Sequence, residues 1–502
     1  MPSLRQGALA VAAAVGLVLA GLLPSGAVAA TSTVPTLDWK PCAEQFECAT
    51  IPVPLDYRKP HGKRISIAMM RAPATDRDNR IGSLFILPGG PGLPGNDFLP
   101  TAPPGALAAL GQFDVVTYDP RGTGASRPLF DCGQGFQVPP SFERAATIDR
   151  RAYEAKTRAY VKACQQKNAL LMPHMSTANA ARDVDLMRKA VGDDKLTALG
   201  ISYGSAIAAT YATMFPGRSR AMVISNPMDV QTYYDRPLDL WLEQSAGYET
   251  VLDRFFQGCL AAGPACGFGG DDPKVAFDNL LAKLDHAPLR GSDPADPVVN
   301  GDFVRQSAMS MTYGLSTWDG FAAALTRLEA GEADPMLDWY EETVGLLGFS
   351  FVNDAYTAVT AVDERWPRGP VSDYFDRRQL GEGLFDHFFF TVGHNELDAA
   401  LWPAKDRNAF HGKIRNPKSA APILVVGATY DSATPYVWSE RLTADLGNAR
   451  LLTFEADGHN AVLTGDFCLF VHVLTYLTDG KTLPPAGTVC VDQREPFSAG
   501  TR

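Results

Sequence analysis

The sequence predicts an α/β fold with a mostly parallel central sheet and helices on both faces. Apolar runs at 84–87 and 422–427, and the mostly apolar segment 113–118, are typical of parallel strands that are buried on both sides. The segment 196–200 is expected to be a short strand, and it is followed by the alanine-rich segment 205–215, which contains no proline and is expected to be helical. This alternation of strands and helices indicates the α/β class.

The junction between that strand and helix carries a serine between two glycines, in Gly200-Ile201-Ser202-Tyr203-Gly204. At a sharp strand-to-helix turn, such a serine has a strained backbone and its hydroxyl projects over the sheet edge. The flanking residues must be small because the strand and the helix approach each other closely. G-x-S-x-G also arises by chance, so the motif indicates a nucleophilic serine only together with other motifs.

A glycine turn follows the predicted strand at 84–87, in Pro88-Gly89-Gly90-Pro91-Gly92. Its backbone N–H groups can face a ligand, as the donors of an oxyanion hole must. Pro91 has no N–H, so we expect Gly90 to supply one donor and the backbone N–H of Tyr203 to supply the other. An ordinary glycine turn is the alternative interpretation.

An acid and a histidine follow later strands. Asp431 comes after the strand at 422–427, and His459 comes after a further predicted strand at 451–454. The chain order serine, acid, histidine is that of α/β-hydrolases. We therefore predict Ser202 as the nucleophile, His459 as the general base and Asp431 as the acid that orients the imidazole.

Other polar residues near these motifs have simpler explanations. Asp457 and Asp466 are rival acids, but neither follows a central strand, and Asp457 is only two residues from His459. Asp119 and Arg121 follow the strand at 113–118, and we expect them to form a structural pair that braces their loop.

The helical signals place a large insertion between the two halves of the core. We predict a first core part at 35–225, a mainly helical cap at 226–414 and a C-terminal core part at 415–502. An insertion at this point is where hydrolases carry a cap over the active site. The stretches with apolar residues at helical spacing are 237–260, 274–284 and 318–328.

These motifs together resemble secreted tripeptidyl aminopeptidases, serine exopeptidases of the α/β-hydrolase fold that are related to proline iminopeptidase. The resemblance extends over about residues 37–497, and its C-terminal segment is the most specific to that family. The resembling motifs are Pro88–Gly92, Phe113–Val116 with Asp119–Gly122, Gly200–Gly204, Asp431–Pro435, Gly458-His459, Cys468, Tyr476–Gly480, Leu483–Pro485 and Cys490.

The chain departs from the family's pattern at two places. Members of the family usually carry Asp-Gly after the strand at 221–224, whereas this chain has Ser225-Asn226-Pro227, a change that affects the expected shape of the pocket floor. The family also implies a cap disulfide between positions that match Ala361 and Ala399 here, and both cysteines are absent.

The resemblance and the motifs favour a serine exopeptidase that releases short peptides, expected to be tripeptides, from free N-termini. Its mechanism would pass through an acyl-enzyme on Ser202 and need no metal or other cofactor. A carboxylesterase or another amide hydrolase with the same residues is the alternative within enzymes. A catalytically silent secreted binding protein is the alternative outside them, and the complete set of serine, histidine and acid argues against it.

An exopeptidase of this kind needs a carboxylate to hold the substrate's ammonium group, because burying an unpaired charge costs several kcal/mol. Asp363 and Glu364 end a predicted cap helix that begins at Ala355. In the resembling enzymes this segment carries an acid near the cleft, so both are candidates for binding the N-terminus. Alternatively, they are solvated or brace Arg365.

The N-terminus has the features of an export signal. Arg5 precedes an apolar stretch at 8–23, and Ala27-Val28-Ala29 matches a signal-peptidase site. We predict residues 1–29 as a signal peptide, cleavage after Ala29 or Ala30, and a secreted enzyme without stable membrane association. A membrane anchor is the alternative, although the apolar run is shorter than a full span.

Eight cysteines form four pairs of sequence neighbours. An even number of cysteines behind an export signal predicts disulfides, but eight cysteines allow about 105 pairings. Pairing of neighbours is the simplest arrangement and agrees with the resemblance. Zinc is the competing interpretation, and the chain has no C-x-x-C or HExxH spacing to bind it. The expected pairs are Cys42 with Cys48, Cys132 with Cys164, Cys259 with Cys266, and Cys468 with Cys490.

Composition narrows the possible partners. The chain has 502 residues, 46% of them hydrophobic, which is enough for a large core. Its net charge is −11, and nucleic-acid binding needs a basic face that the sequence does not show. The expected partners are peptides or proteins with free N-termini.

Overall fold

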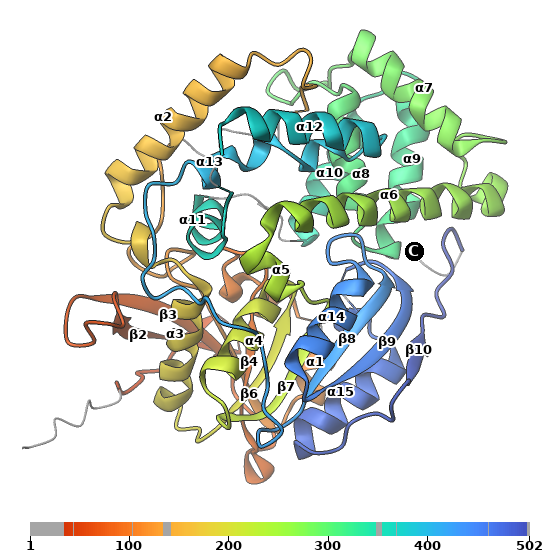
Figure 1. Cartoon of the computed structure of the whole chain (residues 1–502). Coiled ribbons are helices and arrows are strands. Elements are labelled where there is room, and N and C mark those ends of the chain that lie inside the picture. The colour runs from red at the N-terminus through yellow and green to blue at the C-terminus, as the bar shows by residue number, and fades with distance from the viewer. Residues whose placement is uncertain are drawn as a thin grey trace, which may run out of the picture. The chain divides into compact units, whose positions relative to one another are not determined.

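A mostly parallel sheet forms the centre of the computed structural model (Figure 1), which describes residues 35–43, 45–102, 104–133, 142–347, 354–367, 369–459 and 461–498. The predicted signal peptide, 1–29, lies outside the described residues. The strands are β1 (Lys40–Ala43), β2 (Phe46–Pro54), β3 (Arg64–Ala72), β4 (Gly82–Leu87), β5 (Phe113–Tyr118), β6 (Leu196–Ile201), β7 (Ser219–Ser225), β8 (Ile423–Tyr430), β9 (Ala449–Asp457) and β10 (Val489–Val491).

Within the described residues the strand order is β1-β2-β3-β5-β4-β6-β7-β8-β9-β10. The first three pairings, from β1 to β5, are antiparallel. All pairings from β5 to β10 are parallel. The predicted α/β class with a mostly parallel sheet is therefore confirmed. Strand β8 pairs directly with β7, so the sheet joins the two halves of the chain across the long insertion.

Successive residues of the central strands pack on opposite faces of the sheet, as the two-residue period requires. Phe85 belongs to the core on one face, which is covered by α3 (Thr177–Ala190), α4 (Gly204–Met214) and α14 (Tyr436–Leu446). Leu84 belongs to the core on the other face, which is covered by α15 (Phe467–Asp479) and the short α1 (Pro104–Ala109). The prediction of helices on both faces is confirmed.

Helices between β7 and β8 gather on one side of the sheet, above the strands in Figure 1. Their core is rich in aromatic side chains such as Phe255, Trp318 and Phe321. The helices are α5 (Val230–Asp235), α6 (Pro237–Ala262), α7 (Pro273–His286), α8 (Gly301–Met311), α9 (Trp318–Glu329), α10 (Asp334–Leu347), α11 (Asp354–Asp363), α12 (Ser372–Leu384) and α13 (Leu397–Ala400).

Helix α2 (Arg150–Asn168) precedes the serine motif in sequence, yet it packs with this helical layer. The hydroxyl of Tyr160 donates to Asp354 Oδ1 at 2.7 Å, and the backbone N–H of Cys132 donates to Asp354 Oδ2 at 2.6 Å. Asp354 opens α11, so this carboxylate ties α2 and its preceding loop to the inserted helices. Sequence reasoning assigned α2 to the first core part.

The structure joins all eight cysteines in the four expected neighbour pairs: Cys42–Cys48, Cys132–Cys164, Cys259–Cys266 and Cys468–Cys490.

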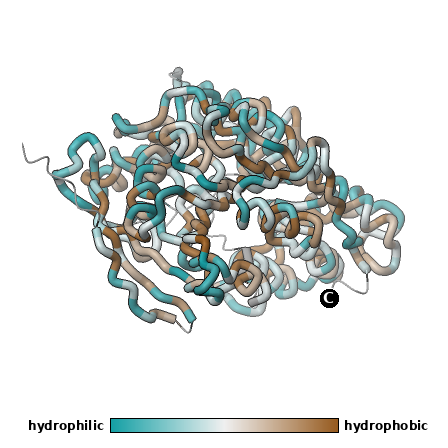
Figure 2. Tube along the Cα trace, turned by 90° about the horizontal axis from the view of Figure 1, so that it is seen from below, coloured by the Kyte–Doolittle hydropathy of each residue, from teal (hydrophilic) through white to brown (hydrophobic). Residues whose placement is uncertain are grey.

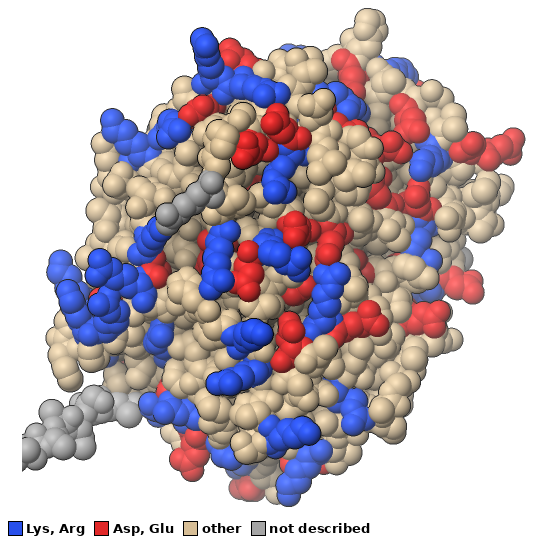
Figure 3. Space-filling model, viewed as in Figure 1, with Lys and Arg blue, Asp and Glu red and all other residues tan. Residues whose placement is uncertain are grey.

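The described surface carries charges of both signs. On the face seen in Figure 3, basic and acidic side chains are interspersed. Figure 2 shows hydrophilic stretches of the trace mainly on the outside and hydrophobic stretches mainly inside. None of the described helices combines the length and the apolar character that crossing a membrane requires.

Candidate active site

Ser202 occupies the sharp turn between β6 and α4, with a left-handed backbone φ of 55°. A side chain at Gly200 would place its Cβ 2.6 Å from the carbonyl oxygen of Gly204, and one at Gly204 would collide with the carbonyl of Leu87. Both glycines are therefore required by close backbone approach. The strained nucleophile turn expected from the sequence is present.

Asp431 lies in the loop after β8, with its side chain buried. Its Oδ1 accepts the backbone N–H groups of Ala433 and Thr434 at 2.9 and 2.8 Å, and its Oδ2 accepts the Thr434 hydroxyl at 2.6 Å. The amide of Asn226 also donates to Oδ2 at 2.6 Å. These donors fix the orientation of the carboxylate.

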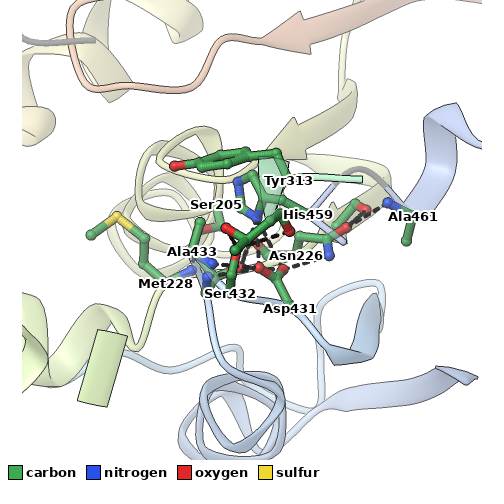
Figure 4. A network of polar contacts seen from close by, with 12 residues as sticks. Ser205, Asn226, Met228, Tyr313, Asp431, Ser432, Ala433, His459 and Ala461 are labelled. Carbon is green, nitrogen blue, oxygen red and sulfur yellow. Dashed lines mark hydrogen bonds and ion pairs between the residues drawn. The ribbon is translucent and has the colours of Figure 1, made fainter. Parts of the chain in front are cut away.

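His459 follows β9 and points its Nδ1 at Asp431, 3.0 and 2.9 Å from the two carboxylate oxygens (Figure 4). Its backbone N–H donates to the carbonyl of Tyr313 at 2.9 Å, and the Tyr313 ring packs edge-on against the imidazole. Gly458 has a φ of 113° and lies against Tyr313 too closely for a side chain. The loop between α8 and α9 therefore positions the histidine.

Ser202 and His459 line one cavity of about 830 Å³. Among the hydrogen bonds of the described residues, none joins the Ser202 hydroxyl to the imidazole. Such contacts are often long before substrate binds. The pair Asp431 and His459, together with a serine on the same cavity wall, can carry out nucleophilic acyl transfer.

The predicted oxyanion loop borders the nucleophile. Gly89 and Gly90 line the cavity, and a Cβ at Gly89 would lie 3.3 Å from the Ser202 Cβ. Tyr203 begins the turn into α4, and its side chain is buried with its hydroxyl 2.5 Å from that of Thr177. The roles of the Gly90 and Tyr203 N–H groups as oxyanion donors stay predictions.

The rival acids have other partners. Asp457 binds the guanidinium of Arg254, with 2.9 Å between Oδ2 and Nη2. Asp466 caps α15 by accepting the backbone N–H of Leu469 at 2.9 Å. Both assignments leave Asp431 as the carboxylate in contact with His459.

The expected pair of Asp119 and Arg121 is wrong. Arg121 forms a buried bidentate ion pair with Asp183 of α3, at 2.8 and 2.7 Å. Asp119 instead accepts the backbone N–H groups of Asn96 and Ala125. The arginine therefore ties its loop to a helix far along the chain, a contact that local sequence spacing could not predict.

Asn226 has a role that sequence reasoning missed, although its departure from the family's pattern marked the position. Besides donating to Asp431, its side chain accepts the backbone N–H of Ala461 at 3.0 Å. It therefore links the acid loop to the segment after His459 (Figure 4). Its φ of 49° is one that asparagine tolerates better than most residues.

The structure separates the two acids predicted to bind an N-terminus. Glu364 lines the cavity. Asp363 is buried outside the cavity wall, where its carboxylate accepts the backbone N–H and the hydroxyl of Thr177 and the hydroxyl of Tyr233. Arg365 does not brace either acid but pairs with Asp235 at 2.8 Å. Asp363 therefore has a structural position.

Two further acids reach the same end of the cavity: Glu396, which ends the 3-10 turn His394–Glu396, and Asp398 in α13. Sequence reasoning missed both. Both carboxylate oxygens of Glu396 and Oε2 of Glu364 are buried without a hydrogen-bond partner among the described residues. Asp398 accepts the Thr357 hydroxyl at 3.1 Å. Two acids one residue apart, in Asn395-Glu396-Leu397-Asp398, are the sequence signal that could have indicated them.

Burial is the largest cause of the raised pKa values of Glu364, Glu396 and Asp398. It raises the pKa of Glu396 to about 8 and that of Asp398 to about 6. Burial also raises the pKa of Glu364 well above its usual value, and the nearby charges of Asp363, Glu396 and Asp398 add to the shift. All three carboxyls therefore hold their protons more tightly than exposed acids do.

Comparison with known proteins shows the family of this chain. Residues 82–266 match the family described as alpha/beta hydrolase fold, and residues 389–490 match the family described as TAP-like protein. Tripeptidyl aminopeptidase of Streptomyces lividans is 32% identical over 472 residues, which cover 89% of this chain and 85% of that protein.

Two mycobacterial proteins are similar over more of the chain. Serine protease Hip1 of Mycobacterium tuberculosis is 31% identical over 536 residues, covering 95% of this chain and 96% of that protein. Carboxylesterase B of M. tuberculosis is 30% identical over 497 residues, covering 94% and 92%. With its α/β-hydrolase sheet and these relatives, the chain belongs to the tripeptidyl aminopeptidase family of α/β-hydrolase serine peptidases.

Proposed function

We propose that this protein is an exported serine exopeptidase that releases short peptides, three residues at a time, from substrates with free N-termini. Export is supported by the signal-like segment 1–29 and by four disulfides. The observation that carries the exopeptidase assignment is the group of buried carboxyls at one end of the cavity that contains Ser202.

In the proposed reaction, the Ser202 oxygen attacks the scissile carbonyl while His459 takes its proton. Asp431 holds the imidazole tautomer and stabilises the imidazolium that forms. The amine half then leaves with that proton. Water next attacks the acyl carbon while His459 takes a proton from it, and the Ser202 oxygen leaves with that proton as the peptide acid is released. The N–H groups of Gly90 and Tyr203 are proposed to stabilise the oxyanion.

The substrate's ammonium group would bind between Glu364 and Glu396. Their unpartnered oxygens are acceptors that no described side chain satisfies, and an ammonium ion supplies three donors. A cation in contact favours the ionised carboxylate, so binding would lower the raised pKa values of these groups. A substrate without this charge would leave the buried acids unpaired and bind less well.

The test compares a free tripeptide anilide with its N-acetylated form. Glu396→Gln and Glu364→Gln should each raise KM for the free peptide about 10- to 100-fold, because a charged hydrogen bond contributes about 1.5–3 kcal/mol. They should change hydrolysis of the acetylated peptide little. Asp363→Asn is the matched control, since this neighbouring acid lies outside the cavity wall. It should affect both substrates alike through stability.

If the Glu396 and Glu364 variants lose the same factor in kcat/KM on both substrates, these acids do not bind the substrate's N-terminus. Mass spectrometry of a digested peptide mixture measures fragment length, and products other than tripeptides would contradict the stated step size.

Ser202→Ala should abolish both turnover and labelling by a fluorophosphonate. Faster cleavage of simple esters than of any peptide would favour the carboxylesterase alternative.

A further inference from the structure

The cavity that contains Ser202 has a second end, built from a different part of the chain. Here its walls come from the sheet residues Leu84, Ile86, Val115 and Leu199 and from helices α1 and α15. We call this end the apolar arm. The carboxyl end is built from α11 and the segment up to α13, which lie above the sheet in Figure 1, whereas α1 and α15 lie low in that view.

The apolar arm exists because α1 is too short to cover its sheet face. Only six residues, Pro104–Ala109, form this helix. Leu84 and Val115 are buried, but Ile86 and Leu199 on the same face are only partly buried and line the cavity. The wall includes Thr101 and Thr117 as uncharged polar residues. Its acid, Asp466, is occupied in capping α15.

The arm reaches the protein surface at a hydrophobic rim. Leu463 and Phe470 line the cavity and are also 59% and 40% exposed. Phe467, one helical turn before Phe470, is 78% exposed. Large apolar side chains at the mouth of a cavity indicate a binding site for an apolar group.

We infer that the apolar arm binds the leaving half of the substrate and selects large apolar residues directly after the scissile bond. This inference rests on the proposed function. The acyl half and the leaving half extend from the reacting carbonyl in different directions, so an N-terminus held between Glu364 and Glu396 directs the leaving half toward the other end of the cavity.

The leaving half acts in one step of the reaction. The bond between the Ser202 oxygen and the carbonyl carbon forms, the C–N bond breaks, and the departing nitrogen takes the proton from His459. The acyl-enzyme that remains no longer contains the group in the apolar arm. Occupation of the arm must therefore change kcat/KM, which includes acylation, and leave hydrolysis of the acyl-enzyme unchanged.

Esters of one fixed tripeptide with alcohols from methanol to hexanol isolate this effect. We expect kcat/KM to rise by up to about fourfold per added methylene, which corresponds to about 0.8 kcal/mol for burial of each CH₂. The rate of acyl-enzyme hydrolysis should be the same for every ester. A flat series in kcat/KM overturns the inference without requiring any variant to fold.

Two variants with a tryptophan on α1 localise the site. Ala106→Trp should remove the advantage of the hexyl ester over the methyl ester, because Ala106 lines the cavity. Ala108→Trp is the matched control: Ala108 is exposed on the same helix and is not part of the cavity wall. Leu463→Asn, at the exposed rim, should reduce the rise in kcat/KM per added methylene, which is the slope of the series. Equal slopes in all three variants and the wild type contradict the assignment.

The same series on N-acetylated tripeptides distinguishes this inference from the proposed function. If free and acetylated substrates are cleaved equally well and kcat/KM still rises with the length of the alcohol, the role of Glu364 and Glu396 in binding the amine is contradicted. The role of the apolar arm then stands. A slope that appears when the acyl chain of a p-nitrophenyl ester is lengthened, and not when the alcohol is lengthened, would show that the arm holds the acyl half. That result overturns the inference.

Discussion

At the scale of single residues, the candidate active site depends on how Asp431 is held. The carboxylate accepts two backbone N–H groups, one hydroxyl and one amide in addition to the imidazole. Asn226 is the member of this set that also contacts the segment after His459. It is a positioning residue, since it acts on the reaction only through Asp431.

Replacing Asn226 with glycine tests this role, because glycine adopts a φ of 49° without strain and lacks the amide. We expect kcat to fall about 10- to 100-fold, the value of a hydrogen bond to a charged group. Asp431→Asn should cost up to about 10⁴-fold, since the amide favours the wrong histidine tautomer. The comparison requires kinetics on one peptide anilide and a urea unfolding curve for each variant.

If Asn226→Gly lowers the free energy of unfolding but leaves kcat unchanged, Asn226 has only a structural role. KM gives a second readout and should change little, because Asn226 does not line the cavity.

At the scale of elements, the inserted helices belong to the active site as much as the sheet does. The turn after α8 holds His459 through the carbonyl of Tyr313, and Gly314 bridges to Gly458. Glu364 directly follows helix α11, and Glu396 ends the 3-10 turn before α13; both line the cavity. Movement of the cap would therefore change the position of the base and the shape of the carboxyl end together.

A buried histidine links two of these cap helices to the segment 385–392. His387 places its ring nitrogens 2.9 Å from Glu249 of α6 and 2.9 Å from Asp278 of α7. Burial alone would lower the pKa of His387, but its hydrogen bonds to the two acids and their charges outweigh burial and raise it. The protonated ring is therefore favoured in the folded protein.

Because the folded pKa of His387 is raised, its stabilising contribution is fully present below the unfolded pKa of about 6.5. The contribution is lost as pH rises through the higher folded value. We expect the urea midpoint of the wild type to exceed that of His387→Gln at pH 5.5 by more than it does at pH 9. A difference that is constant across this range would mean that His387 contributes only packing and neutral hydrogen bonds.

At the scale of the whole molecule, the disulfides stabilise local segments around a core built from two distant parts of the chain. The sequence separations of the pairs are 6, 7, 22 and 32 residues. None of these bridges crosses the insertion between β7 and β8. The two core parts are held together instead by the β7–β8 pairing and by shared packing.

Longer closed loops restrict the unfolded chain more, so Cys132–Cys164 should contribute most to stability. Replacing both of its cysteines with alanine should lower the free energy of unfolding by about 3–4 kcal/mol, against about 2 kcal/mol for Cys42–Cys48. Urea denaturation of the two double variants measures the difference. Specific activity of the folded fraction should be unchanged, since no cysteine lines the cavity.

The sequence by itself determined the features that depend on local order. Apolar runs marked the central strands, two glycines around Ser202 marked a turn where backbones touch, and chain order indicated Asp431 and His459. Each of these patterns lies within a few residues, where steric demands act directly on residue choice.

Only the tertiary structure decided which distant side chains share an environment. It brought Glu396 beside Glu364 and left Asp363 outside the cavity, it joined Arg121 to Asp183, and it packed α2 against the cap. The physical reason is that these contacts join residues from separate elements, and their energies depend on burial and distance, which no spacing within one segment encodes.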